Sequence, residues 1–169
     1  MLENRNVTSN LLSDQFESLR IARLGAVFDQ ANALMEWVYR EFRYESGVTN
    51  VNTHLEEAFQ MRRGVCQDFT HVMLGLCRAV GIPARYASGY LYNGPRDTLV
   101  GAQASHAWAE GYLPAAGWIG FDPTNNTLAD ERYVKISVGR DYEDVAPVRG
   151  SYNGTGHCRM EVQVEVEKI

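Results

Sequence analysis

The spacing of apolar residues changes once along this 169-residue chain, and the change constrains the fold more than any other feature. Up to about residue 80, apolar residues recur every three or four positions, as on the buried face of an amphipathic helix. From Tyr86 onward the repeat falls to two, which is typical of strands. Helices first and strands second predict the α+β class, with an antiparallel sheet laid against one of the helices.

Two helices are predicted in the first third of the chain. The first has an apolar stripe over residues 27–42 and is broken by Gly47. In the second, Thr53 and Glu56 have the spacing of a capping box, in which each side chain satisfies a backbone N–H at the helix start. This spacing predicts a short helix that ends near Gln60.

The third predicted helix is the central one. It begins at or beside Cys66 and ends at Gly81, with Pro83 beyond it, because glycine accommodates the left-handed end of a helix and proline does not continue one. Its buried side is expected to carry Phe69, Val72, Met73, Leu76 and Val80.

Strands are predicted from alternating residues in the second half. They lie at about residues 86–92, 106–112, 118–122, 134–138 and 160–166, and the last of these has the clearest alternation of apolar and polar residues. The sheet that they form is expected to pack on the central helix.

Composition indicates one domain and excludes two classes of partner. With 45% hydrophobic residues the chain can bury a substantial core, so we expect a single folded domain over residues 26–169, preceded by a lead-in segment over residues 1–25. The net charge of -5 and the pI near 5.4 argue against a nucleic-acid or anionic-membrane surface, since both require clustered Lys and Arg.

The chain carries no evident targeting or membrane-spanning pattern. No apolar run approaches the roughly 18 residues that a spanning helix requires. The first ten residues are polar and mixed in charge, unlike a secretory signal peptide. A cytoplasmic location is therefore expected.

Cys66, Cys77 and Cys158 are expected to be free thiols. Cys66 and Cys77 are eleven positions apart on one predicted helix, about 16 Å along its axis, which is too far for a disulfide. A zinc site would need ligand pairs at metal spacing, and none exists in the sequence. Neither a metal nor an organic cofactor is implied, and Cys77 and Cys158 are assigned to the core.

The candidate catalytic residues are Cys66, His106 and Asp122. Only the thiolate is a useful nucleophile, and a helix N-terminus and a nearby imidazolium both favour it over the thiol. In this interpretation Cys66 attacks the substrate, and His106 takes its proton and later protonates the leaving group. Asp122 fixes the imidazole tautomer and stabilises the imidazolium.

The turn at residues 114–116 determines whether His106 and Asp122 can meet. If the loop has three residues, Leu113 pairs with Gly117, and His106 and Asp122 become diagonal neighbours on one face, about 7–8 Å apart at the backbone. A two- or four-residue loop would turn Asp122 to the other face.

The oxyanion donors are only partly predicted. The backbone N–H of Cys66 is expected to supply one hydrogen bond. Trp37, Gln67 and Tyr44 are the candidates for the second donor, and the sequence does not rank them.

Other polar and aromatic residues have simpler interpretations. His54 and His71 are expected to be structural, and Asp68 to be a first-turn acid that complements the helix dipole. Trp108 and Trp118 either line a substrate groove or pack in the core.

Several motifs together resemble the transglutaminase-like superfamily of papain-like cysteine enzymes, and specifically the bacterial transglutaminase-like cysteine peptidases. The resemblance runs from about Leu24 to Val166 and implies a papain-like core with Cys66, His106 and Asp122 as the triad. Such proteins usually carry a β-rich domain ahead of this core, and this chain begins almost at the core. The resemblance therefore implies an upstream β-rich domain as a partner. The motifs are Trp37-Val38 with Phe42-Arg43-Tyr44, Gly64-Val65-Cys66-Gln67-Asp68-Phe69-Thr70-His71, Gly81-Ile82-Pro83-Ala84-Arg85-Tyr86, Ser88-Gly89-Tyr90-Leu91, Ser105-His106-Ala107-Trp108-Ala109-Glu110, Gly117-Trp118-Ile119-Gly120-Phe121-Asp122-Pro123-Thr124-Asn125 and Gly139-Arg140-Asp141-Tyr142-Glu143-Asp144-Val145.

The sequence thus predicts acyl transfer from a peptide or protein amide through a thioester on Cys66. Attack by water would make the protein a peptidase, amidase or deamidase, and attack by an amine would make it a protein-glutamine transglutaminase. Hydrolysis ranks first, because a core of this size shows no obvious second site for a protein amine. A non-catalytic interaction domain on the same fold is the remaining alternative.

Overall fold

The computed structural model describes residues 27–51, 53–92, 100, 105–114, 116–148, 150 and 164–167. The predicted lead-in segment, Cys158, and the larger part of the predicted strand at residues 160–166 lie outside the described residues. The described part of that strand, residues 164–166, has no regular secondary structure.

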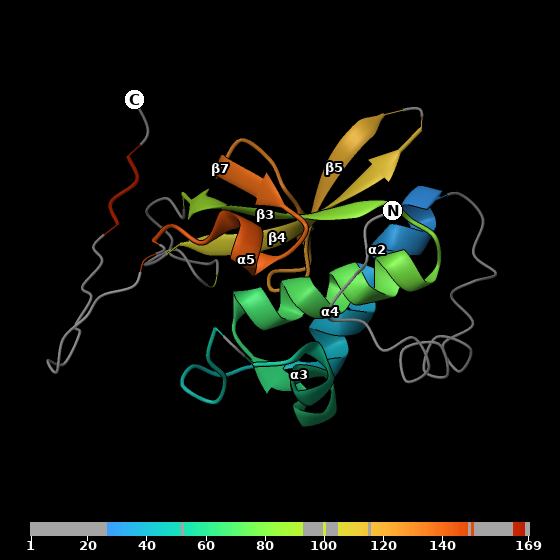
Figure 1. The fold of residues 1–169 in the computed structure, drawn as a ribbon. Coiled ribbons are helices and arrows are strands. Elements are labelled where there is room, and N and C mark those ends of the chain that lie inside the picture. Colours follow the sequence, from blue (N-terminus) through green and yellow to red (C-terminus); the bar gives the residue numbers. More distant parts are fainter. Residues whose placement is uncertain are drawn as a thin grey trace, which may run out of the picture.

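The fold consists of helices packed on a five-stranded antiparallel sheet, which confirms the predicted α+β class (Figure 1). The helices are α2 (Val27–Glu41), α3 (Leu55–Met61), α4 (Cys66–Ala79) and the short α5 (Tyr142–Val145). The sheet has the order β6-β5-β4-β3-β7. Its strands are β3 (Ala84–Leu91), β4 (His106–Leu113), β5 (Gly117–Asp122), β6 (Thr127–Leu128) and β7 (Tyr133–Gly139).

Helix α4 is the central helix, as predicted, and packs on the sheet as well as on α2 and α3 (Figure 1). It ends ahead of Gly81, whose φ of +81° places it in the left-handed region that glycine adopts at little cost. Nine of its fourteen residues are buried, including Phe69, Val72 and Leu76. Truncating a buried leucine of this kind to alanine costs about 2–5 kcal/mol.

The start of α3 differs from the predicted capping box. Helix α3 forms, but its N-cap is His54, whose side chain makes no capping hydrogen bond. The Oγ1 of Thr53 instead accepts a hydrogen bond from the backbone N–H of Asn50 at 2.9 Å. The capping prediction is therefore wrong, because a turn ahead of the helix uses the Thr53 hydroxyl.

The hairpin between β4 and β5 has the predicted three-residue loop. Leu113 pairs with Gly117, and Ala109 pairs with Phe121. The loop closes through a hydrogen bond from the N–H of Ala116 to the carbonyl of Leu113, and Gly117 has a φ of +78°. Since side chains alternate between faces, this register places His106 and Asp122 on the same face of the sheet.

A second, two-stranded parallel sheet was not predicted. It pairs β1 (Arg43–Tyr44) with β2 (Arg63–Gly64), and Tyr44 lies opposite Gly64. This pairing fixes the chain just ahead of Cys66 against the end of α2. Among the described residues, no helix is long and apolar enough to cross a membrane.

Candidate active site

Cys66 is the first residue of α4 and is partly exposed. The backbone N–H of Val65, the N-cap, donates to Oδ2 of Asp68 at 2.7 Å, and the Thr49 hydroxyl donates to the same oxygen at 2.7 Å. Asp68 is therefore a first-turn acid that holds the start of the helix, as predicted. A side chain at position 64 would collide with the Asp68 carboxylate, which explains the glycine there.

His106 and Asp122 form a buried hydrogen-bonded pair. The distance from Nε2 of His106 to Oδ2 of Asp122 is 2.8 Å, and both side chains are buried. Because an ionised carboxylate only accepts hydrogen bonds, Nε2 carries the proton. The other ring nitrogen, Nδ1, is thus the one left to face a nucleophile.

Asp122 accepts four further hydrogen bonds. The backbone N–H groups of Thr124 and Asn125 donate to Oδ1 at 2.8 and 3.3 Å, and Nδ2 of Asn125 and the Tyr133 hydroxyl donate to Oδ2 at 2.8 and 2.7 Å. Burial alone would raise the pKa of Asp122. The donors and the charge of His106 outweigh burial and lower it, so this carboxyl group stays ionised.

Cys66 lies beside the imidazole of His106. Burial disfavours the charged ring, but the hydrogen bond to Asp122, the charge of Asp122 and the influence of nearby Cys66 raise the pKa of His106 above its usual value. Among the described residues, Nδ1 of His106 has no hydrogen-bond partner. The structure therefore puts His106 and Asp122 in direct contact and places Cys66 near enough to affect the pKa of His106.

Two tyrosines also lie close to Cys66. Burial raises the pKa of Tyr44 and of Tyr86, and the charge of Cys66 contributes to each shift. Tyr44 lies on the same side of the molecule as the start of α4 because β1 pairs with the residues just ahead of that helix, and its ring packs 6.3 Å from that of Phe69. Tyr86 extends from β3.

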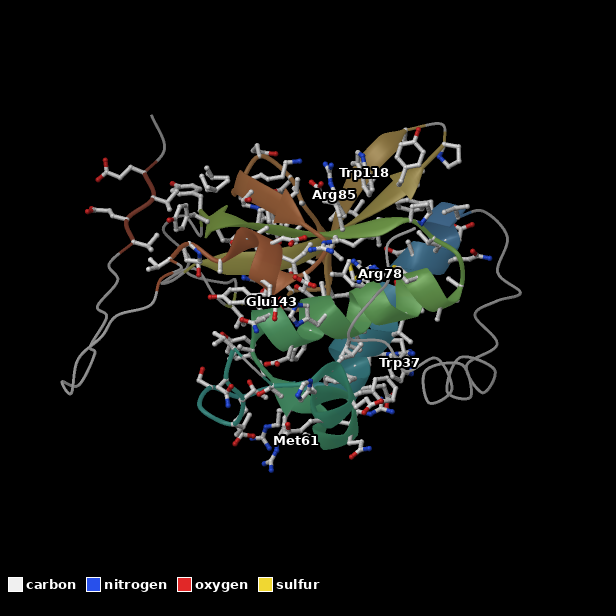
Figure 2. The ribbon with its side chains drawn as sticks, viewed as in Figure 1. Trp37, Met61, Arg78, Arg85, Trp118 and Glu143 are labelled. Atoms are coloured by element: carbon white, nitrogen blue, oxygen red, sulfur yellow. The ribbon has the colours of Figure 1, made fainter. Side chains whose placement is uncertain are left out.

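The three candidates for the second oxyanion donor are placed differently. Trp37 packs with Phe59 at a ring distance of 6.0 Å and lies under the Arg62 guanidinium, away from the sheet (Figure 2). Nε2 of Gln67 donates to the carbonyl of Val51 at 3.4 Å. Tyr44 is the candidate whose hydroxyl lies near the thiol.

The remaining predicted residues fall into simple groups. His71 is partly buried on α4, and His54 is exposed. Trp108 is buried next to His106, with ring centroids 6.3 Å apart. Trp118 is half-exposed and carries the Arg85 guanidinium 4.1 Å from its ring centroid, on the sheet face away from the helices (Figure 2).

Sequence reasoning missed Asn125, Tyr133 and Tyr86. Asn125 could have been found, because an aspartate at the start of a turn commonly accepts the N–H groups two and three residues on. Tyr133 and Tyr86 come from other strands, and no local pattern marks them.

Comparisons with known proteins agree with this geometry. The profile of the family described as the transglutaminase-like superfamily matches residues 19–123. An uncharacterised protein of Mycobacterium leprae is 41% identical over 81% of this chain and 49% of its own length. A protein-glutamine gamma-glutamyltransferase of Pseudomonas aeruginosa is 32% identical over 61% of this chain and 17% of its own length.

Solved structures show the same fold. A protein of Cytophaga hutchinsonii described as a "putative cysteine protease" superposes with a TM-score of 0.72 and 33% identity, covering 86% of this chain and 47% of that one. The periplasmic domain of TgpA from Pseudomonas aeruginosa gives a TM-score of 0.54 and 25% identity, covering 75% of this chain and 45% of that one. The chain spans about half the length of the mycobacterial relatives it matches.

Proposed function

The chain belongs to the transglutaminase-like superfamily, and on that premise we propose that it transfers an acyl group from an amide through a thioester on Cys66. The observation that carries the proposal is the buried hydrogen bond between His106 and Asp122. Because Nε2 of His106 donates to Asp122 at 2.8 Å, Nδ1 is the ring nitrogen left to exchange a proton with the thiol of Cys66. A peptide or protein amide is the proposed acyl donor.

The first half of the reaction acylates the enzyme. Nδ1 of His106 takes the proton from Sγ of Cys66, and the thiolate forms a bond to the carbonyl carbon of the amide. The resulting oxyanion collapses, the C–N bond breaks, and Nδ1–H delivers its proton to the departing amine. Asp122 stabilises the imidazolium throughout. The products are an amine and a thioester on Cys66.

The second half releases the acyl group. His106 takes a proton from an incoming water or amine, which attacks the thioester carbon. The C–S bond breaks, and the proton returns to the sulfur of Cys66. Water yields a carboxylic acid and a primary amine yields a new amide.

Two donors are proposed for the oxyanion. The backbone N–H of Cys66 is free of intrahelical bonds because it lies in the first turn of α4. The Tyr44 hydroxyl is the second, supported by the pairing of β1 with the residues just ahead of Cys66 and by the effect of the Cys66 charge on the pKa of Tyr44. Removing one oxyanion donor in an acyl-transfer enzyme costs about 10²–10³ in kcat, so Tyr44→Phe should lower kcat with little change in fold.

We rank hydrolysis ahead of transamidation. The Pseudomonas relative is a glutamyltransferase, but this chain covers only 17% of it. A panel of acyl donors with and without primary amines, read by mass spectrometry, separates the hydrolysed from the transamidated product. Exclusive amine incorporation would reverse the ranking.

Cysteine labelling distinguishes the enzyme from an interaction domain that has the same fold. Iodoacetamide should modify Cys66 rapidly, and Cys66→Ala should abolish both labelling and turnover while leaving the fold intact. Cys77 is the matched control, since burial raises its pKa to about 12 and leaves it unreactive. Labelling of Cys77 with Cys66 inert would contradict the assignment.

A further inference from the structure

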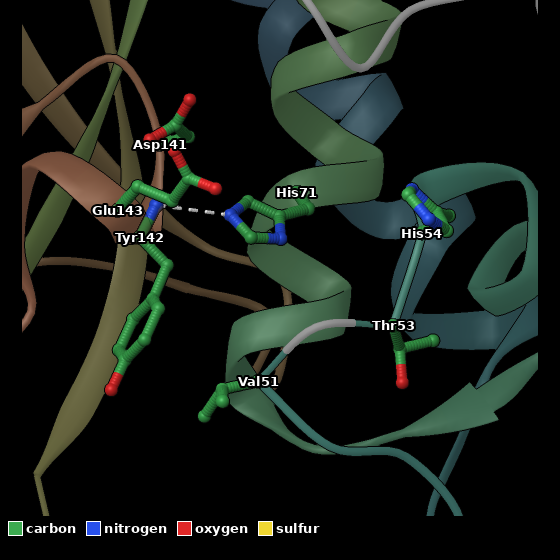
Figure 3. A pocket seen from close by; sticks show the side chains of 7 residues that line it. All are labelled: Val51, Thr53, His54, His71, Asp141, Tyr142 and Glu143. Carbon is green, nitrogen blue, oxygen red and sulfur yellow. Dashed lines mark hydrogen bonds between the residues drawn. The ribbon is translucent and has the colours of Figure 1, made fainter. Parts of the chain in front are cut away.

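A pocket of about 190 Å³ opens beside α4, outside the three residues assigned to catalysis. The loop ahead of α3, the middle of α4 and the start of α5 form its walls (Figure 3). Its lining consists of two histidines, two acids, a threonine, a valine and a tyrosine: His54, His71, Asp141, Glu143, Thr53, Val51 and Tyr142.

Two contacts link the lining of the pocket to the neighbourhood of Cys66. Gln67, the next residue along α4, donates to the carbonyl of Val51 at 3.4 Å, and Val51 lies beside the first turn of α4 in Figure 3. On the other side, the ring of His71 lies 5.2 Å from that of Tyr86, the tyrosine affected by the charge of Cys66. A peptide bound with its carbonyl at the thiol could therefore extend into this pocket.

His71 contributes a neutral hydrogen-bond donor. Its Nε2 accepts from the backbone N–H of Tyr142 at 3.2 Å, which places the ring proton on Nδ1. Burial lowers the pKa of His71 to about 4, so the ring carries no charge at neutral pH. Among the described residues Nδ1 has no partner, and it faces the side of Val51 and Thr53 in Figure 3.

The charged groups that line the pocket are carboxylates. Asp141 and Glu143 line it, whereas the nearby guanidinium groups do not. Arg140 is held by Asp144 through two hydrogen bonds of 2.8 Å, and Arg78 donates to the carbonyl of Arg140. The charges of Arg78 and Arg140 also act on Asp141, and that of Arg140 acts on Glu143. The three carboxylates, Asp141, Glu143 and Asp144, still exceed these two guanidinium groups by one negative charge.

We infer that this pocket is a subsite for a basic side chain, lysine or arginine, of the acyl-donor peptide. The carboxylates would hold the cation, and Val51 and Tyr142 would cover the aliphatic part of such a side chain. An acidic side chain would meet like charges at Asp141 and Glu143. The inference rests on the proposed function, because it assigns the pocket to the substrate of Cys66.

The test uses covalent probes, so no natural substrate is needed. Chloroacetyl dipeptide amides that carry Lys, norleucine or Glu at either position alkylate a thiolate by forming a C–S bond and expelling chloride. Labelling of Cys66 is followed by intact mass and peptide mapping. For at least one position, the Lys reagent should react about five-fold faster than its norleucine analogue, and the Glu reagent should react more slowly than both. A difference in rate of about five-fold is what one charge interaction near a protein surface is expected to give.

Charge variants test whether the carboxylates of the pocket cause the faster reaction of the Lys reagent. Glu143→Gln should reduce the ratio of Lys to norleucine rates several-fold, whereas Asp29→Asn, the same loss of charge at an exposed site on α2, should leave the ratio unchanged. Equal Lys and norleucine rates at Cys66, or a ratio that Glu143→Gln does not move, would overturn the subsite while leaving the thiol chemistry intact. Failure of every reagent to label Cys66 would instead refute the proposed function and the subsite with it.

Discussion

The hydroxyl of Tyr133 and Nε2 of His106 bind the same oxygen of Asp122. The distances to Oδ2 are 2.7 and 2.8 Å. Thr127 Oγ1 lies 2.9 Å from the Tyr133 hydroxyl, and since Tyr133 uses its proton on Asp122, Thr127 is the donor in that pair. Strand β7 therefore contributes a hydrogen bond to the candidate site, although none of its residues belongs to the predicted triad.

Tyr133→Phe should raise the pKa of Asp122, because it removes one of the donors that lower it. A depressed carboxyl pKa stabilises the fold above the unfolded value near 4, and this stabilisation is lost as pH falls through the folded pKa. The variant should lose about 1.5–3 kcal/mol at neutral pH, as for a hydrogen bond to a charged group. It should also lose less stability than the wild type on further acidification.

The measurement is urea unfolding from neutral pH down to about pH 3, with the pH profile of Cys66 alkylation alongside. The acid limb of that profile should move to higher pH in Tyr133→Phe. Tyr112→Phe is the control, since Tyr112 is half-exposed and packs on Trp118 at a ring distance of 5.4 Å. An acid limb unchanged in Tyr133→Phe would mean that Tyr133 contributes to stability alone.

The sequence predicted those parts of the site that depend on neighbouring residues. The register of β4 and β5 follows from the length of one short loop, so the pairing of Leu113 with Gly117 could be worked out from the sequence. The position of Cys66 follows from the helix start, where Asp68 supplies the expected first-turn acid.

The parts that were not predicted depend on contacts between distant segments. Tyr133 reaches Asp122 because β7 returns to pair with β3, at the far edge of the sheet from β5. Sheet order of this kind is not encoded in the alternation of a single strand. The capping prediction at Thr53 failed for a local reason. The Thr53 hydroxyl can accept from an N–H at the helix start or from an N–H in the turn ahead of it, and it accepts from the backbone N–H of Asn50 in that turn.

His71→Gln should weaken the loss of stability between neutral and mildly acidic pH. Burial lowers the pKa of His71 to about 4, and Nε2 must stay unprotonated to accept from Tyr142. The unfolded state therefore binds a proton first, and stability falls as pH drops from about 6.5 towards 4, by up to about 3 kcal/mol. A glutamine oxygen can accept the same hydrogen bond without titrating.

Urea unfolding at pH 7 and pH 5 checks this expectation. His106 has a raised pKa, so its contribution is complete below about pH 6.5 and is lost only at higher pH. The difference between wild type and variant therefore isolates His71. His54→Gln is the matched control, because His54 is exposed. Equal losses in wild type and His71→Gln would show that His71 does not control the acid response.

Gly64→Ala should displace the start of α4 and with it Cys66. The new Cβ would overlap the carboxylate of Asp68, which holds the N–H of Val65 and the hydroxyl of Thr49. The backbone at residue 64 has little freedom to move away from Asp68, because Gly64 is paired with Tyr44 in the two-stranded sheet. Overpacking of this kind costs about 1–3 kcal/mol, and the lost hydrogen bonds to a buried carboxylate add to it.

Urea unfolding and the alkylation rate of Cys66 should both detect the change in Gly64→Ala. Gly150→Ala is the control, because a Cβ there meets no atom within 4 Å, and it should leave both unchanged. If Gly64→Ala matched Gly150→Ala in stability and in alkylation rate, the close approach of Asp68 would not be what requires glycine ahead of the nucleophile.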